Sequence, residues 1–195
     1  MADFARTKSS YRKLYAFQKA EAIYDLTYFF LGKNIPKSDR TYDQMLQAAR
    51  SGKQNIVEGR SDAAASAEME IKLYGVARGS LHELLNDYLD YMRTRHVPIW
   101  YPGHPRFAAL RQTCFSNNET GYFMSLAPRM SDEELTNMTV TLIYQCIGML
   151  SKLIELVKDD FLKNGGIKEQ MLRARLNYRG KRSQNNQENN DNKIS

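Results

Sequence analysis

The sequence predicts an all-α protein: an antiparallel up-down four-helix bundle with a long connection before the last helix and a short C-terminal suffix helix. Apolar residues recur every three or four positions in four long segments, a capping-box motif marks the start of the last one, and no segment alternates like a β-strand. A chain of 195 residues that is 42% hydrophobic can bury one substantial core. One domain with extensions is therefore expected.

The first two helices are expected over residues 10–31 and 38–59. Gly32 and Pro36 end the first helix, Ser38 is a candidate N-cap for the second, and Gly59 closes the second. Each helix has an apolar face at helical spacing: Phe17, Ala20, Tyr24, Tyr28 and Leu31 in the first, and Tyr42, Met45, Leu46, Ala49, Ile56 and Val57 in the second.

The two longer helices are expected from residues 61–66 to about 95 and from 131 to about 163. Ser131 and Glu134 have the spacing of a capping box, which makes this the clearest helix start in the chain. The apolar faces are Met69, Leu73, Val76, Ser80, Leu84 and Tyr91 in the third helix, and Leu135, Met138, Leu142, Cys146, Met149, Leu153 and Leu156 in the fourth.

The remaining segments are expected to connect or extend the bundle over 10–163. Residues 96–130 contain repeated proline and glycine, which predicts a long connection or insertion with one short helix over 106–114. Residues 164–182 form a basic suffix segment whose helix covers 167–179. Residues 1–9 are expected to be a flexible N-terminus, and the Asn- and Gln-rich residues 183–195 a disordered tail.

A second apolar stripe on each of the two longer helices predicts further contacts. It comprises Leu81, Leu85, Leu89 and Met92 in the third helix, and Val140, Ile143, Ile147, Leu150 and Ile154 in the fourth. One bundle core needs only one stripe per helix. Either the connection 96–130 folds back over these residues, or they form a subunit interface, and both alternatives remain open.

The sequence contains no recognisable catalytic or metal-binding pattern. Cys114 and Cys146 lie far apart without a CxxC motif, and the residue three before His82 is Gly79 rather than the glutamate of a di-iron site. There is no P-loop and no GxGxxG motif. The expectation is a non-enzymatic cytoplasmic protein without cofactor or metal. We also expect no membrane association, because no signal-like segment is visible and the densest apolar run, residues 28–31, is short.

The positive charge of the chain is concentrated at its two ends. Residues 1–20 hold five Lys or Arg against one Asp, and residues 165–182 hold six against one Glu. Clustered cations attract phosphate backbones through counterion release. The candidate nucleic-acid-binding residues are therefore Arg12, Lys13, Lys19, Lys168, Arg173, Arg175, Arg179, Lys181 and Arg182.

Two motifs resemble one family of four-helix bundles. They are Arg50-Ser-Gly-Lys-Gln-Asn-Ile-Val-Glu-Gly59 and Ala77-Arg-Gly-Ser-Leu-His-Glu-Leu84. The family comprises proteins encoded in intervening sequences of bacterial 23S ribosomal RNA genes and accessory variability proteins of diversity-generating retroelements. Residues 164–175 also resemble its suffix segment. The matching motif positions are Asn55, Glu58, Gly59, Gly79, Ser80 and Glu83.

The resemblance implies a homopentamer that binds RNA, DNA or a nucleoprotein such as a reverse transcriptase. Gly79 and Ser80 are expected to permit close helix approach. Two functions remain open from the sequence: a nucleic-acid or nucleoprotein binding module, and a purely structural oligomeric scaffold without nucleic acid. The sequence itself names no partner.

Overall fold

The computed structural model describes residues 10–62 and 66–191, and all regular structure within them is helical. The predicted all-α class is therefore confirmed for this part of the chain, whereas the expected flexible segment 1–9 lies outside it. The elements are η1 (Tyr11–Lys13), α1 (Tyr15–Asn34), α2 (Arg40–Asp62), α3 (Ala67–Thr94), α4 (Phe107–Ser116), α5 (Thr120–Leu126), η2 (Ala127–Arg129), α6 (Asp132–Asn164) and α7 (Ile167–Asp191).

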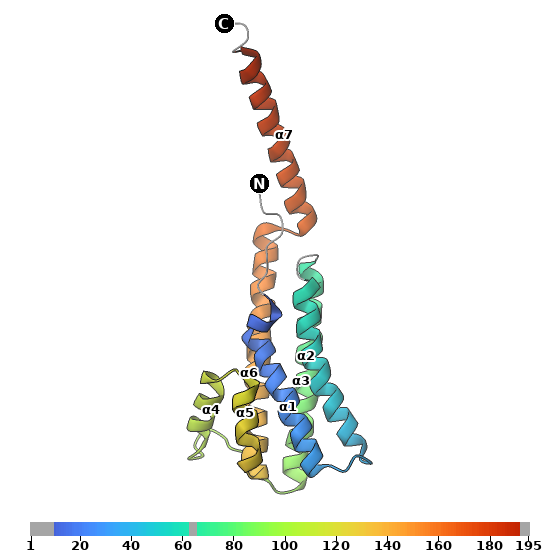
Figure 1. Ribbon diagram of the computed structural model, residues 1–195, viewed down its shortest axis with the longest axis vertical. Coiled ribbons are helices and arrows are strands. Elements are labelled where there is room, and N and C mark those ends of the chain that lie inside the picture. The colour runs from blue at the N-terminus through green and yellow to red at the C-terminus, as the bar shows by residue number, and fades with distance from the viewer. Residues whose placement is uncertain (1–9, 63–65, 192–195) are drawn as a thin grey trace.

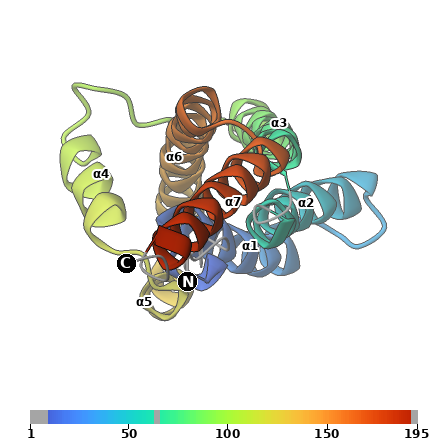
Figure 2. The same ribbon diagram turned by 90° about the horizontal axis from the view of Figure 1, so that it is seen from above.

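Four long helices, α1, α2, α3 and α6, lie side by side along the length of the molecule (Figure 1). α1 contacts α2 and α6, and α3 contacts the same two helices. α4 packs on α6 and α5 packs on α1, so that both short helices lie outside the four long ones (Figure 2). α7 projects beyond the end at which α1 begins and α6 ends (Figure 1). The buried apolar side chains form a cluster shared by these elements, α7 excepted.

α1 buries a wider face than its sequence predicts. Phe17, Ala20 and Leu31 are buried as expected, but Tyr28 is 58% exposed, so its assignment to the core is wrong. The core face instead passes through Ile23, Leu26 and Phe30, which are fully buried. The reason is that α1 contacts α2, α5 and α6 at once, and the face that meets all three lies to one side of Tyr28.

α2 and α3 pack closely because α2 carries two glycines on the face that meets α3. A Cβ atom at Gly52 would lie 3.0 Å from the Leu81 side chain, and one at Gly59 would lie 3.0 Å from the Tyr74 ring. Gly59 therefore serves packing, and α2 continues past it to Asp62. Nothing lies within 4 Å of a Cβ built at Gly79, so the expected close approach at that residue is wrong.

Replacing Gly59 with alanine is expected to destabilise the protein by about 1–3 kcal/mol, because the new methyl group overpacks the contact with Tyr74. Gly79→Ala is the matched control. It fills open space on an exposed helix surface and is expected to stabilise the fold by about 0.5–1 kcal/mol. Urea unfolding followed by circular dichroism measures both changes, and equal effects of the two substitutions would contradict the close approach.

The core face of α3 is shifted by one residue in its first half. Met69 and Val76, expected in the core, are 42% and 45% exposed, whereas Glu70 and Tyr74 are fully buried. The Tyr74 hydroxyl donates to the Glu70 carboxylate at 2.9 Å, and Arg60 lies 3.5 Å from the same carboxylate. A buried glutamate is tolerated here because its charge is paired. Further along α3, Leu84 and Tyr91 are buried as predicted.

The second apolar stripe belongs mainly to the core of the chain itself. The subunit-interface alternative is therefore wrong for its buried members, which are Leu81, Leu85, Met92, Val140, Ile143, Leu150 and Ile154. Leu89 and Ile147 are half-buried and pack against the core. Ile99 and Trp100 share a cavity wall with Leu89, so the connection does fold back over this part of the stripe.

α6 begins with the predicted capping box. The Ser131 hydroxyl accepts from the backbone N–H of Glu134, and the Glu134 carboxylate accepts from the backbone N–H of Ser131. Leu135, Met138, Leu142 and Cys146 are buried as predicted. Leu156 is 64% exposed, contrary to prediction, because the C-terminal part of α6 extends past the start of α1 (Figure 1).

By length and composition alone, one apolar stretch within Asp132–Gly180 is long enough to cross a membrane, although core helices of soluble proteins pass the same test. The expectation of no membrane association stays a prediction.

The two remaining helical regions differ from expectation in extent. The connection contains α4, close to the predicted short helix, and also α5, which the sequence did not indicate. α7 starts at the predicted position but continues past Arg179 to Asp191, through residues expected to be a disordered tail. The side chains of residues 181–191 lie outside what the structure describes.

Candidate functional site

α7 presents an exposed row of basic side chains. Lys168, Arg175 and Arg179 are all exposed and lie within about 40° of one another around the helix, at about 100° per residue. Arg173 is exposed on another side, and Lys181 and Arg182 continue the helix with side chains outside the described part. We call Lys168, Arg175 and Arg179 the basic row. α7 projects from the other helices (Figure 1), and the side chains of the row are exposed to solvent.

α7 also exposes large apolar side chains beside the basic row. Met171, Leu172 and Leu176 are 57%, 58% and 57% exposed, and Tyr178 is 70% exposed. Isolated exposed apolar residues are common, whereas several on one helix form an apolar surface of the kind that often serves contacts between molecules. Two kinds of contact, with phosphate and with an apolar surface, are therefore available on α7.

The N-terminal basic residues divide between the surface and the core. Arg12 and Lys13 of η1 are exposed, and the Arg12 guanidinium lies 5.6 Å from the centre of the Tyr11 ring. η1 directly precedes α1, whose first turn lies nearer to α7 than its last turn does (Figure 1). Arg12 and Lys13 therefore remain candidates for phosphate contact.

Lys19 is completely buried, so its assignment to a nucleic-acid surface is wrong. Its ammonium group donates to the backbone carbonyls of Cys114 and Asn117, at the C-terminal end of α4, and lies 5.5 Å from the centre of the Phe123 ring in α5. A cation satisfies the carbonyls that a helix leaves unpaired at its C-terminus. Burial lowers the pKa of Lys19. Its role is to fasten α4 and α5 onto α1.

The family-motif residues mostly serve contacts within α2 and between α2 and α3. Asn55 donates to the Ser51 carbonyl at 2.9 Å, and the hydroxyls of Ser51 and Ser80 are 3.0 Å apart across the two helices. Glu58 is exposed and accepts from Gln54 of its own helix at 3.4 Å. Ser80 and Glu83 also line an open groove.

That groove, of about 570 Å³ between α2 and α3, is acidic. Asp43, Glu83 and Asp87 are among its lining residues. Burial, and then the charges of Asp90 and Glu83, raise the pKa of Asp87. Carboxylates at this density repel phosphates. The α2–α3 motif surface is therefore unsuited to binding a nucleic-acid backbone.

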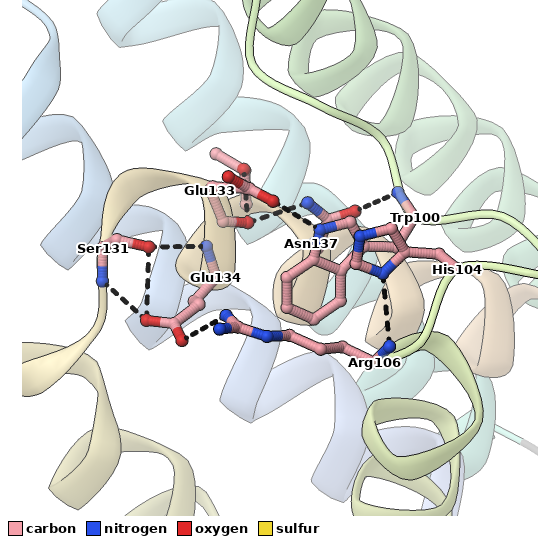
Figure 3. Close-up of polar contacts among 8 residues, drawn as sticks. Trp100, His104, Arg106, Ser131, Glu133, Glu134 and Asn137 are labelled. Atoms are coloured by element: carbon pink, nitrogen blue, oxygen red, sulfur yellow. Dashed lines mark hydrogen bonds and ion pairs between the residues drawn. The ribbon is translucent and has the colours of Figure 1, made fainter.

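A basic, aromatic surface surrounds Trp100, in the segment 96–130 that is expected to be a connection. Asn137 of α6 holds the backbone of this segment in place. Its carboxamide accepts a hydrogen bond from the Trp100 backbone N–H and donates one to the Pro98 carbonyl, each at 2.8 Å. The Trp100 indole N–H donates to Glu133 at 2.7 Å (Figure 3). The backbone of residues 98–100 is thereby attached to α6 at fixed positions.

His104 and Arg106 complete this surface. The His104 ring stacks on Trp100 with 4.9 Å between centroids and 10° between planes. The Arg106 guanidinium lies 5.6 Å from the Trp100 ring centre and pairs with Glu134 at 3.0 Å (Figure 3). The backbone N–H of Ser131 bonds to Glu134 and holds its pKa below the usual range. Trp100 is therefore fixed in orientation by its neighbours.

A local charge count would have indicated this surface. Residues 91–118 contain four arginines and no Asp or Glu, together with Trp100 and four other aromatic residues. The charge counts at the two ends of the chain, over residues 1–20 and 165–182, do not include this segment. Two cavities adjoin Trp100: an open one of about 620 Å³ beside α4 and η2, and a more enclosed one of about 280 Å³ against α3 and α6.

The two cysteines are free and buried, one in α4 and one in α6. Burial raises the pKa of each thiol to about 12. Thiols in this state are protonated and unreactive at neutral pH. No group of three or more His, Cys, Asp or Glu side chains able to hold a metal ion is found within residues 10–62 and 66–191.

Comparison of the chain with models of protein families, with curated proteins and with solved structures gives no match.

Proposed function

We propose that this protein is a non-enzymatic oligomeric helical bundle that binds nucleic acid, or a nucleoprotein, through its basic surfaces. The observation that carries the proposal is the exposed basic row, Lys168, Arg175 and Arg179, on a helix that projects from the rest of the molecule. Such a row contacts phosphates without reading bases. The exposed pair Arg12 and Lys13 adds positive charge toward the same end.

We infer that α1, α2, α3 and α6 constitute the antiparallel up-down four-helix bundle that the sequence predicts. The closed circuit of contacts, α1 to α2 to α3 to α6 and back to α1, supports this arrangement. It also agrees with the bundle that the family resemblance implies. The insertion of α4 and α5 adds to such a bundle without entering the circuit.

The expectation of a homopentamer rests on the family resemblance and needs an interface other than the second apolar stripe, whose members are mostly buried. The exposed apolar residues of α7 and of the end of α6, among them Leu156 and Leu162, are the available candidates. Light scattering at micromolar concentration measures the number of subunits. A monomer would contradict the pentamer.

Replacing Lys168, Arg175 and Arg179 with alanine together is expected to weaken binding of single- and double-stranded probes alike. Each lost phosphate contact reduces the slope of log affinity against log salt by about 0.7–0.9, so the slope should fall by roughly 2 to 3. Fluorescence anisotropy of labelled probes across a salt series measures it. Sequence preference is expected to be weak, because backbone contacts carry no base information.

The control for this triple variant removes the same charge elsewhere. Lys37, Arg40 and Arg50 are exposed on α2 and the connection before it, away from α7. Their replacement with alanine changes net charge equally and should alter the salt slope far less. Equal slopes for both triple variants would show that net charge alone governs binding and would remove α7 from the site.

A structural scaffold without nucleic acid is the second candidate, favoured by the exposed Met171, Leu172 and Leu176. These residues fit an apolar partner surface better than a phosphate chain. Absence of probe binding by the unmodified protein at low salt, with the oligomer intact, would favour the scaffold and exclude the first proposal.

A further inference from the structure

The enclosed cavity of about 280 Å³ lies between the loop that follows α3 and the outer face of α6. Its walls are mainly apolar and aromatic and include Leu89, Ile99, Phe107 and Val140. Tyr101 and Tyr144 are also lining residues and are 63% and 55% exposed, which places their rings at its mouth. Pockets for drug-sized ligands measure roughly 300–1,000 Å³. This one lies just below the small end of that range, and its aromatic walls suit a small ring system.

Gln145, a lining residue of the cavity, has a carboxamide of known orientation. Its side-chain nitrogen donates to the Arg111 carbonyl at 3.0 Å, which determines which way the carboxamide faces. Its oxygen is buried and has no partner in the described chain. A buried acceptor without a donor costs free energy that a ligand N–H group recovers. An occupant whose N–H or amino group reaches this oxygen would therefore bind more tightly than one without a donor.

Arg111 adds a cation to the same cavity. Its side chain is exposed, and no described carboxylate forms an ion pair with it. Residues 91–118 contain no Asp or Glu, so the surrounding segment is basic. By contrast, Arg106 beside the larger cavity is already paired with Glu134. An anionic group attached to the flat ring is thus attracted to Arg111.

We propose that this cavity binds the base of a nucleotide, with the phosphate at Arg111. A nucleobase is flat, packs against aromatic rings and presents an N–H or amino donor, and its phosphate matches the free cation. The nucleotide is either free or an unstacked residue of a single strand. Binding of a free nucleotide does not depend on the proposed nucleic-acid binding. Binding of a base within a strand rests on that proposed function.

The test uses the full chain and adenosine monophosphate as probe. Equilibrium dialysis measures binding, and the fluorescence of Trp100, the sole tryptophan and a lining residue, reports its location. Saturable binding that changes Trp100 emission is expected. Ribose 5-phosphate, which has the phosphate but no base, should compete at least about tenfold more weakly, because it forfeits stacking. Equal competition by ribose 5-phosphate, or no saturable binding of the nucleotide, would overturn the proposal.

Three substitutions test the three features of the cavity separately. Arg111→Gln should weaken nucleotide binding about tenfold, since it removes a charged hydrogen bond. Tyr144→Ala should weaken it about fivefold or more through lost stacking. Gln145→Leu should weaken it about fivefold. Tyr144 and Arg111 are exposed, so loss of their side chains leaves the core intact. These two variants therefore test the cavity even if Gln145→Leu disturbs α4.

Matched controls are available outside the cavity. Arg40→Gln on α2, Tyr122→Ala on α5 and Gln112→Leu on α4 remove the same residue types from exposed positions and should bind the nucleotide normally. If Arg111→Gln and Tyr144→Ala also bind normally, the cavity is not the site and the proposal fails.

Single-stranded octanucleotides distinguish the two sources of the base. Competition with the mononucleotide would place the base within a strand, and absence of competition would assign the cavity to free nucleotides. The triple variant of the basic row should lose strand binding yet keep mononucleotide binding. If strand binding by α7 is wrong, or if nucleotide binding by the cavity is wrong, these experiments therefore give different results.

Discussion

Raising the pH from 9 to 12 is expected to abolish most of the stability of this protein. Burial holds the pKa of Cys114 and of Cys146 at about 12, against 9.0 in the ordinary thiol. A thiol whose pKa is raised by folding stabilises the fold fully below pH 9 and loses that contribution as the pH rises toward 12. Together the two thiols therefore lower the free energy of unfolding by about 2.7 kcal/mol for each pH unit between these values. The total free energy of unfolding of a protein is about 5–15 kcal/mol.

Three other buried groups modify this profile. Burial also raises the pKa of Tyr74 and Tyr88 above 10.0, so both add to the loss at high pH. Lys19 acts in the opposite sense, because burial lowers its pKa from 10.5. The unfolded chain binds the Lys19 proton more tightly, and stability from this group rises until pH 10.5. The decline should therefore be shallow near pH 9.5 and steep above 10.5.

Urea unfolding at intervals between pH 8 and 11.5 measures this dependence. The double variant Cys114→Ala, Cys146→Ala should flatten the slope above pH 10.5 by about 2.7 kcal/mol per pH unit. Tyr178→Phe, which removes a 70% exposed hydroxyl, is the control and should leave the slope unchanged. A slope unaffected by loss of both thiols would show that they are not buried in the folded chain.

Replacing Lys19 with methionine is expected to destabilise the protein by about 2 kcal/mol or more. Methionine fills similar space but leaves the carbonyls of Cys114 and Asn117 without the ammonium donor, and each buried unsatisfied group costs about 1–3 kcal/mol. Relief from burying a cation offsets part of this cost. The loss should be largest in α4 and α5, because Lys19 joins both to α1.

Hydrogen exchange and chemical unfolding together measure the Lys19 effect. Amides of α4 and α5 should lose protection before those of α2 and α3. Lys33→Met is the control: it lies on the same helix and forms a surface ion pair with Asp132 at 2.9 Å. Exposed pairs contribute about 0–1 kcal/mol. Uniform loss of protection throughout the chain would contradict a local fastening role.

The Lys19 contact also bears on the proposed nucleotide cavity. The loop from Pro98 to Trp100 is held by Asn137, and α4 is held by Lys19 on one side and by the Gln145 bond to the Arg111 carbonyl on the other. Loss of the Lys19 contact should therefore loosen α4, which supplies Phe107 and Arg111 to the cavity. Lys19→Met is expected to weaken nucleotide binding although Lys19 does not line the cavity.

Local sequence patterns were sufficient for the helices themselves. The capping box at Ser131 and the N-cap at Ser66, whose hydroxyl accepts from the Met69 backbone N–H, start helices at the predicted places. The all-α class follows from helical periodicity, which depends only on neighbours along the chain. The basic character of α7 was likewise predicted from a local property, the excess of Lys and Arg in residues 165–182.

The partners of each helix face were decided by tertiary structure. Lys19 and Glu70 look like surface residues in the sequence, yet both are buried, because α4 supplies carbonyls to one and Arg60 and Tyr74 reach the other. The second apolar stripe similarly became core once other segments of the chain covered it. The cavity beside Gln145 exists only because residues 99–107 fold back onto α6. Periodicity along one helix determines which side chains share a face, whereas burial depends on residues distant in the sequence, which no local pattern encodes.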